Sequence, residues 1–271
     1  VISPELGIAL PGLSLICPDS HTCTLGGLGA LAWGVGSTEA EHALATSTLR
    51  VTRPETMRTL YTGTLAADVT AKDLILFTIR ELSAGGGAGY AIEFAGPAVE
   101  SLPVEARLTL CNMATELSAF TGIIAPDQKV VEYCSGRPYA PKDALWDEAS
   151  RYWQSLRSDE AAVFDCERII DISSLQPQLS WGTSPQHCID WNATVPKLSD
   201  AYDADQAAAW ERAQMYMGVK GGSQLSDYPI DAAFIGSCTN SRLSDLRAAA
   251  DYLQRTGARV AKGVKALCVP G

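Results

Sequence analysis

Short apolar runs alternate along this chain with amphipathic stretches of helical period. The runs predict strands because they are brief, apolar and bounded by turn residues. Two capping-box pairs, Thr38 with Glu41 and Thr70 with Asp73, predict that helices begin between the runs. We expect strands over 13–17, 57–65 and 90–94, helices over 39–49, 71–83, 104–120 (ended by Gly122) and 146–156, and an irregular segment over 173–206.

The C-terminal part of the chain has the clearest pattern. A strand is expected over 232–236 and another over 266–269, with a helical stripe from Leu243 to Leu253 between them. Such a strand–helix–strand unit is expected to be parallel and right-handed. Because strands and helices alternate through most of the sequence, the predicted fold class is α/β with mostly parallel sheets.

Composition narrows the possible partners. The chain has 271 residues, 21 basic and 31 acidic, for a net charge of −10, and 46% of its residues are hydrophobic. This composition is that of a folded chain rather than a disordered one. The acidic surplus argues against a nucleic-acid or anionic-membrane partner, because no excess of basic side chains can neutralise phosphates. The longest weakly polar stretch, 25–36, is too short to span a membrane.

The eight cysteines are too sparse for a disulfide scaffold, and none form a Cys-x-x-Cys pair. We therefore interpret most of them as reduced, buried thiols of a cytoplasmic protein, and no signal peptide is expected. The chain begins with Val1 and stops at Val269-Pro-Gly271, just after an expected core strand. We expect it to be a piece of a longer protein.

A first candidate site is Gly236-Ser-Cys-Thr-Asn-Ser241, which follows an expected strand and precedes a helix. Open α/β sheets bind ligands at this position. Loop N–H groups and a helix N-terminus would favour a Cys238 thiolate, which can be a nucleophile or a metal ligand. The alternative is that Cys238 is a small residue filling a tight turn.

A second candidate is Asp19-Ser-His-Thr22, also in a turn after a strand. Asp19 and His21 could both face a cleft and take part in acid–base chemistry. The alternative is a turn or capping motif. The remaining histidines, His42 and His187, are interpreted as structural.

The third candidate is Cys111-Asn-Met-Ala-Thr-Glu116. On the expected helix, Asn112 and Glu116 are four residues apart and share one face. A solvated helix face would explain this spacing. However, the apolar neighbours leave little polar surface, so a polar cleft is the other interpretation.

Together these segments resemble the aconitase superfamily of iron–sulfur hydro-lyases, and within it the large subunits of isopropylmalate isomerases. The resemblance covers essentially the whole chain and implies α/β/α subdomains. It implies the end of a first subdomain at 1–54, a second at 55–170, and the start of a third at 171–271. The stretches that carry it are Asp19–Thr22, Leu110–Glu116 and Ile235–Arg242, supported by Ala140–Lys142, Tyr152–Leu156 and Trp181–Pro185.

The resemblance implies a [4Fe–4S] cluster held by three cysteines, with one iron open to substrate. Cys238 matches the first of these ligands. The family's other two lie in a Cys-x-x-Cys after the Val-Pro-Gly turn, where this chain ends. A cluster short of one protein ligand can act as a Lewis acid on a substrate hydroxyl.

The same resemblance implies roles for the other motif residues. His21 and Glu116 would form a pair that stabilises the imidazolium, suiting His21 to protonate a leaving hydroxyl. Asp19 would orient a second histidine absent from this chain, Ser20 would line the substrate site, and Asn112 would hydrogen-bond near the cluster. A separate small subunit would be the partner and would supply the catalytic serine base.

The implied reaction is the dehydration and rehydration that interconvert 2-isopropylmalate and 3-isopropylmalate in leucine biosynthesis. Pro18 and Leu25-Gly26 depart from the isomerase pattern, which has Gly before Asp-Ser-His and His-Gly shortly after it. An aconitase-, homoaconitase- or citramalate-type dehydratase is therefore an alternative substrate class. A cysteine hydrolase using Cys238 and His21 would be a different class of enzyme. A cluster-less relative that binds RNA would be no enzyme at all, and the negative charge disfavours it.

Overall fold

The computed structural model describes residues 2–237 and 239–270. The chain divides into two compact units, one over residues 2–176 and the other from Pro177 onward. Each unit has its own buried apolar core. The finer three-subdomain division, at residues 54 and 170, stays a prediction.

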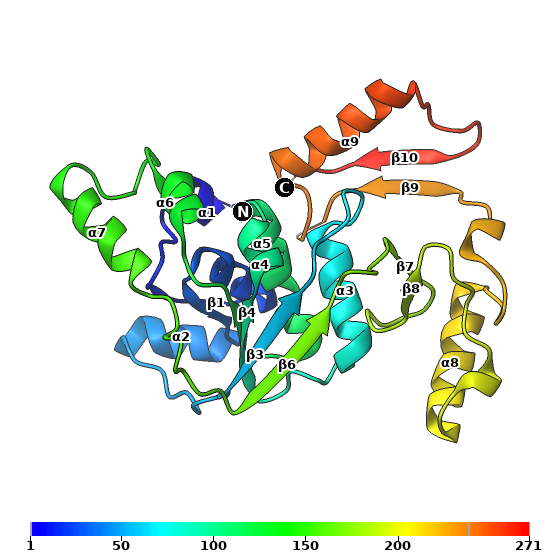
Figure 1. The fold of residues 1–271 in the computed structure, drawn as a ribbon, viewed down its shortest axis with the longest axis horizontal. Helices are drawn as coiled ribbons and strands as arrows, with labels where there is room; N and C mark the ends of the chain where they lie inside the picture. Colours follow the sequence, from blue (N-terminus) through cyan, green and yellow to red (C-terminus); the bar gives the residue numbers. More distant parts are fainter. Residues whose placement is uncertain (1, 238, 271) are drawn as a thin grey trace. The chain divides into compact units, whose positions relative to one another are not determined.

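The first unit is built on a four-stranded parallel sheet with the strand order β5-β4-β3-β6. Alternate residues of β3 point into the core, so Met57, Thr59 and Tyr61 are fully buried. Helix α3 packs its apolar stripe against this face through Leu74 and Ile79. Figure 1 shows β3 and β6 side by side with α3 beside them. The bounds are β3 Glu55–Thr62, β4 Tyr90–Ala95, β5 Thr121–Ile123, β6 Cys166–Asp171 and α3 Ala71–Leu82.

A second core in the same unit surrounds a two-stranded parallel sheet, β1 Ser14–Cys17 with β2 Leu31–Gly34. The two strands are joined by a 3₁₀ segment, η1, over Ser20–Leu28. Leu28 of η1 packs in this core with residues of α5, α6 and α7. Those helices span Val104–Asn112, Gln128–Cys134 and Ala144–Gln154.

Helix α5 corrects one prediction. The helix expected over 104–120 ends at Asn112 and continues as the 3₁₀ helix η2, Met113–Leu117. Gly122 does not end it but lies within β5, where a Cβ would come within 2.8 Å of the Ala114 methyl. Ser118, in a left-handed conformation at φ 61°, ends η2 instead.

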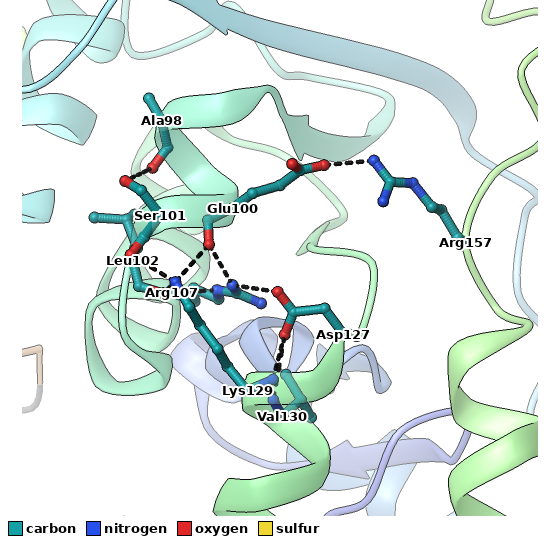
Figure 2. Close-up of polar contacts among 9 residues, drawn as sticks. All are labelled: Ala98, Glu100, Ser101, Leu102, Arg107, Asp127, Lys129, Val130 and Arg157. Atoms are coloured by element: carbon teal, nitrogen blue, oxygen red, sulfur yellow. Dashed lines mark hydrogen bonds and ion pairs between the residues drawn. The ribbon is translucent and has the colours of Figure 1, made fainter.

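The start of α5 is fixed by a buried arginine, as Figure 2 shows. Arg107 is 1% exposed and donates to the carbonyls of Glu100 (2.9 Å) and Leu102 (3.2 Å) and to Asp127 Oδ2 (2.6 Å). Asp127 also caps α6, because its Oδ1 accepts hydrogen bonds from the N–H groups of Lys129 and Val130. One ion pair thus ties together α4 (Pro97–Ser101), α5 and α6.

The second unit contains the predicted parallel βαβ unit, with β9 Ala232–Ile235, α9 Leu243–Thr256 and β10 Lys265–Cys268. Figure 1 shows α9 running alongside these two strands. The segment expected to be irregular, 173–206, instead includes an antiparallel pair, β7 Gln178–Ser180 with β8 Cys188–Asp190. Their turn is closed by His187, whose ring stacks on Trp181 with ring centroids 4.7 Å apart.

The strand-and-helix alternation confirms the α/β class and the mostly parallel sheets. Among the described residues, no helix has the length and apolar character needed to cross a bilayer. The remaining elements are α1 Ile2–Leu6, α2 Ser37–Thr46, α8 Ala204–Met217, η3 Leu198–Asp200 and η4 Leu225–Asp227.

Candidate active site

The candidate site starts in the turn that follows β1. Asp19 is the N-cap of η1, and its Oδ1 accepts a hydrogen bond of 2.7 Å from the His21 backbone N–H. The Thr22 hydroxyl donates to the Asp19 carbonyl at 2.7 Å. The turn interpretation of this motif is thus correct, and the same turn presents Ser20 and His21 at its edge.

The His21 imidazole has polar groups on both of its nitrogen sides. Nε2 lies 3.5 Å from Glu116 Oε1, and Nδ1 lies 3.1 Å from the Ser20 hydroxyl and 3.9 Å from Asp19 Oδ1. The side chains of His21 and Glu116 are 25% and 36% exposed, so both reach solvent. A protonated imidazole would form an ion pair with Glu116 at this distance.

Asn112 is buried and contacts the segment that carries His21 rather than the His21–Glu116 pair itself. It is 1% exposed, and its Nδ2 donates to Thr24 Oγ1 at 2.7 Å. Since α5 ends at Asn112 and Glu116 is in η2, the two residues do not share an α-helical face as predicted. The structure still brings both close to His21, because Glu116 lies 3.5 Å from its ring and Asn112 bonds Thr24, whose hydroxyl bonds the His21 carbonyl.

The η1 segment approaches its neighbours so closely that glycines are required. A Cβ on Gly26 would lie 1.8 Å from the Gly122 carbonyl oxygen, and one on Gly27 would lie 2.6 Å from the Leu108 backbone nitrogen. The Gly26 carbonyl accepts a hydrogen bond from the Ile124 N–H at 2.9 Å. The glycine-rich stretch therefore packs His21's turn onto α5 and β5.

A hollow of about 670 Å³ opens beside Asp19 and Ser20. Its apolar wall includes Trp33 and Phe120, whose ring centroids are 5.2 Å apart. Arg50 is the cation in the described lining. The same lining also carries the carboxylates of Asp19 and Glu39 and the Ser20 hydroxyl, so the hollow is mixed in charge.

Cys238 lies outside the described residues. Its neighbours form a tight turn after β9, in which the Ser237 hydroxyl accepts hydrogen bonds from the N–H groups of Thr239 (3.2 Å) and Asn240 (3.0 Å). The predicted strand–loop–helix setting is confirmed by β9 and α9. The convergence of Cys238 with His21 and Glu116 stays a prediction.

The other cysteines do not form a cluster site. Across residues 2–237 and 239–270, no group of three or more His, Cys, Asp or Glu side chains could hold a metal ion. The seven described cysteines are all free thiols, as expected. Burial raises the pKa of Cys23 to about 11 and that of Cys134 to about 11, and raises the pKa of Cys111 well above its ordinary value. At neutral pH these buried thiols therefore stay protonated.

Comparisons with known proteins agree on one family. The model of the aconitase family (aconitate hydratase) matches residues 1–271. The chain belongs to the aconitase family. It is 52% identical over all of its 271 residues to the 3-isopropylmalate dehydratase large subunit 1 of Bradyrhizobium diazoefficiens. It spans 56% of the length of that relative. The family implies an iron–sulfur cluster, although the described residues do not form a metal site on their own.

Sequence reasoning missed three features of this site. Thr24 gave only a weak signal, as one small polar residue at the start of a glycine-rich run. Arg50 gave none, because nothing in its sequence neighbourhood points to the hollow that it lines. The pairing of Arg107 with Asp127 joins residues 20 apart in sequence and depends on how α5 and α6 pack.

Proposed function

We propose that this chain is part of a large subunit of 3-isopropylmalate dehydratase, which interconverts 2-isopropylmalate and 3-isopropylmalate by removing and re-adding water. Membership of the aconitase family and 52% identity to a large subunit of that name support the proposal. A separate small subunit would be its partner, the pathway would be leucine biosynthesis, and its location would be the cytoplasm.

The observation that carries the chemistry is the His21–Glu116 pair, with 3.5 Å between Nε2 and Oε1. Glu116 would stabilise positive charge on the imidazole and fix the ring from the Nε2 side. Nδ1, on the Ser20 side, is then the atom that gives a proton to the departing substrate hydroxyl, so that water leaves. In the reverse step the same nitrogen takes the proton back as water adds.

The residues around this pair have supporting roles in the proposal. Ser20 would hydrogen-bond the substrate at the edge of the hollow that it lines. Asp19 would orient a second histidine from outside this chain, in addition to capping η1. The base that removes the carbon-bound proton would come from the small subunit.

In this proposal the [4Fe–4S] cluster is bound by the complete protein rather than by this chain alone. A [4Fe–4S] cluster needs three cysteine ligands, and Cys238 would be one of them. The described residues supply no such group, so they do not fit a cluster by themselves. We therefore assign no step of the reaction to the cluster from this chain alone.

The test uses the full-length large subunit with its small subunit, reconstituted with iron and sulfide under argon. Dehydration of 2-isopropylmalate, citrate, homocitrate and citramalate is measured side by side. We expect the highest kcat/KM with 2-isopropylmalate, and loss of both the cluster absorbance and turnover in Cys238→Ser. Higher kcat/KM with another of these acids would overturn the substrate assignment. Activity that survives iron chelation would overturn the assignment of this protein as an iron–sulfur hydro-lyase.

A further inference from the structure

We propose that Thr24 is a positioning residue for His21, because its hydroxyl joins the turn that carries His21 to the Asn112 side chain. This proposal rests on the proposed function in assigning His21 to proton transfer. Its structural part concerns only how the imidazole is held against Glu116.

The Thr24 hydroxyl makes hydrogen bonds to both the His21 backbone and the Asn112 side chain. Thr24 Oγ1 donates to the His21 carbonyl at 2.6 Å and accepts from Asn112 Nδ2 at 2.7 Å. A second link runs in parallel, since Cys23 Sγ lies 3.4 Å from the Asn112 carbonyl oxygen, to which it donates. The high pKa of Cys23, about 11 through burial, keeps this thiol protonated as a donor at neutral pH.

The elements on either side of this bridge are also held by contacts other than the bridge itself. On one side, α5 is held at its start by Arg107 and Asp127 (Figure 2). On the other, η1 is pressed against β5 and α5 at Gly26 and Gly27. Between them, the His21 backbone departs from helical geometry (φ −92°, ψ 18°), with its N–H bonded to Asp19 Oδ1 at 2.7 Å and its carbonyl bonded to Thr24 Oγ1. The Thr24 hydroxyl and the Asp19 carboxylate therefore hold the His21 backbone from its carbonyl and its N–H, and the Thr24 hydroxyl also joins it to Asn112.

The imidazole position depends on that turn. The Nε2–Oε1 distance of 3.5 Å is at the long end of a useful contact, so a small shift of the His21 backbone would separate the pair. Misplacing a catalytic group by about 1 Å can cost on the order of 100-fold in rate. Valine has nearly the shape of threonine but carries a methyl group in place of the hydroxyl, so Thr24→Val removes both hydrogen bonds of the bridge.

The experiment compares three variants of the full-length enzyme with its small subunit and matched cluster content. Thr24→Val should lower kcat by about tenfold or more and leave KM within about twofold, whereas Thr24→Ser should keep kcat near that of the wild type. Thr78→Val is the matched control. The Thr78 hydroxyl likewise donates to a carbonyl, that of Leu74, and bonds another side chain, the Tyr61 hydroxyl, in the main core. It should lower stability and leave kcat unchanged.

A double-mutant cycle separates positioning from general weakening. If Thr24 acts through the His21–Glu116 contact, the effects of Thr24→Val and Glu116→Gln on kcat will combine to less than their product. The proposal is overturned if the effects of the two substitutions on kcat multiply fully. It is also overturned if Thr24→Val changes KM instead of kcat, or if Thr78→Val loses as much kcat as Thr24→Val.

A second readout needs neither cluster nor turnover. In the full-length large subunit labelled with ¹³C-histidine and kept free of iron, the His21 ring signals should move toward solvent-like shifts in Thr24→Val and stay unchanged in Thr24→Ser and Thr78→Val. Unchanged His21 signals in Thr24→Val would overturn the positioning role. The two proposals can also fail separately. If the wild-type enzyme dehydrates none of the four acids but the His21 signals still move in Thr24→Val, the proposed function is overturned and the positioning role remains.

Discussion

Replacing Arg107 with methionine tests the contact that holds α5, and thus the floor of the candidate site. Methionine keeps most of the buried stem and removes the guanidinium. The change deletes hydrogen bonds to Asp127 Oδ2 and to the carbonyls of Glu100 and Leu102. It also leaves the Asp127 carboxylate without its counter-charge.

The structure sets the size of the effect. Removing one partner of a buried ion pair costs about 3–5 kcal/mol. Two features reduce the loss here. Asp127 is 33% exposed and can be rehydrated, and Lys129 Nζ also donates to the Glu100 carbonyl at 2.7 Å. We therefore expect Arg107→Met to lower the free energy of unfolding by about 3 kcal/mol, the low end of that range.

The pH dependence of the free energy of unfolding tests whether the Asp127 charge is responsible for this stabilisation. Burial alone would raise the pKa of Asp127, but the hydrogen bond and charge of Arg107, with the N–H groups of Val130 and Lys129, lower it below its ordinary value. A carboxyl whose pKa is lower in the folded state gives its full stabilisation above its unfolded value of about 3.9, and loses it as the pH falls through the folded value. The penalty of Asp127→Asn should therefore be largest at neutral pH and shrink below about pH 4.

The assay is urea unfolding at pH 7 and pH 3.5, followed by hydrogen exchange of the peptide over 104–112. This readout reports on α5 rather than on the second unit of the chain. A cost below about 1 kcal/mol for Arg107→Met, typical of an exposed pair, would refute the reasoning. So would an Asp127→Asn penalty that is equal at the two pH values.

Three further predictions concern the site directly. Glu116→Gln should lower kcat of the complete enzyme about 100-fold or more with little change in KM, and a variant that keeps half of wild-type kcat in steady-state assays would make Glu116 a solvated surface residue. Gly26→Ala should destabilise the first unit by at least about 2 kcal/mol, because its Cβ would collide with the Gly122 carbonyl; calorimetry showing an unchanged Tm would contradict this close packing. Exposed Cys17 and Cys268 should react with iodoacetamide at pH 8 well before Cys23, because burial raises the pKa of Cys23 to about 11. Peptide mapping that finds Cys23 labelled as fast as the other two would show that η1 opens readily.

The sequence determined the local elements and the motif residues of this protein. Apolar periodicity and capping residues predicted β3, β4, α3 and the βαβ unit, because those signals arise within a few residues of the chain. Two of the three motifs supply Asp19, His21, Asn112 and Glu116 as candidate site residues from the sequence alone. The resemblance that they carry agrees with the family match.

Tertiary structure decided how those residues meet. The α-helix expected over 104–120 ends at Asn112 and continues as the 3₁₀ helix η2, in which Glu116 lies 3.5 Å from His21, and the helical pattern of the sequence did not predict this change. The Thr24–Asn112 bond joins residues 88 apart in sequence. No local pattern encodes such a pair, because it exists only when two separate segments pack together and a buried polar group needs a partner.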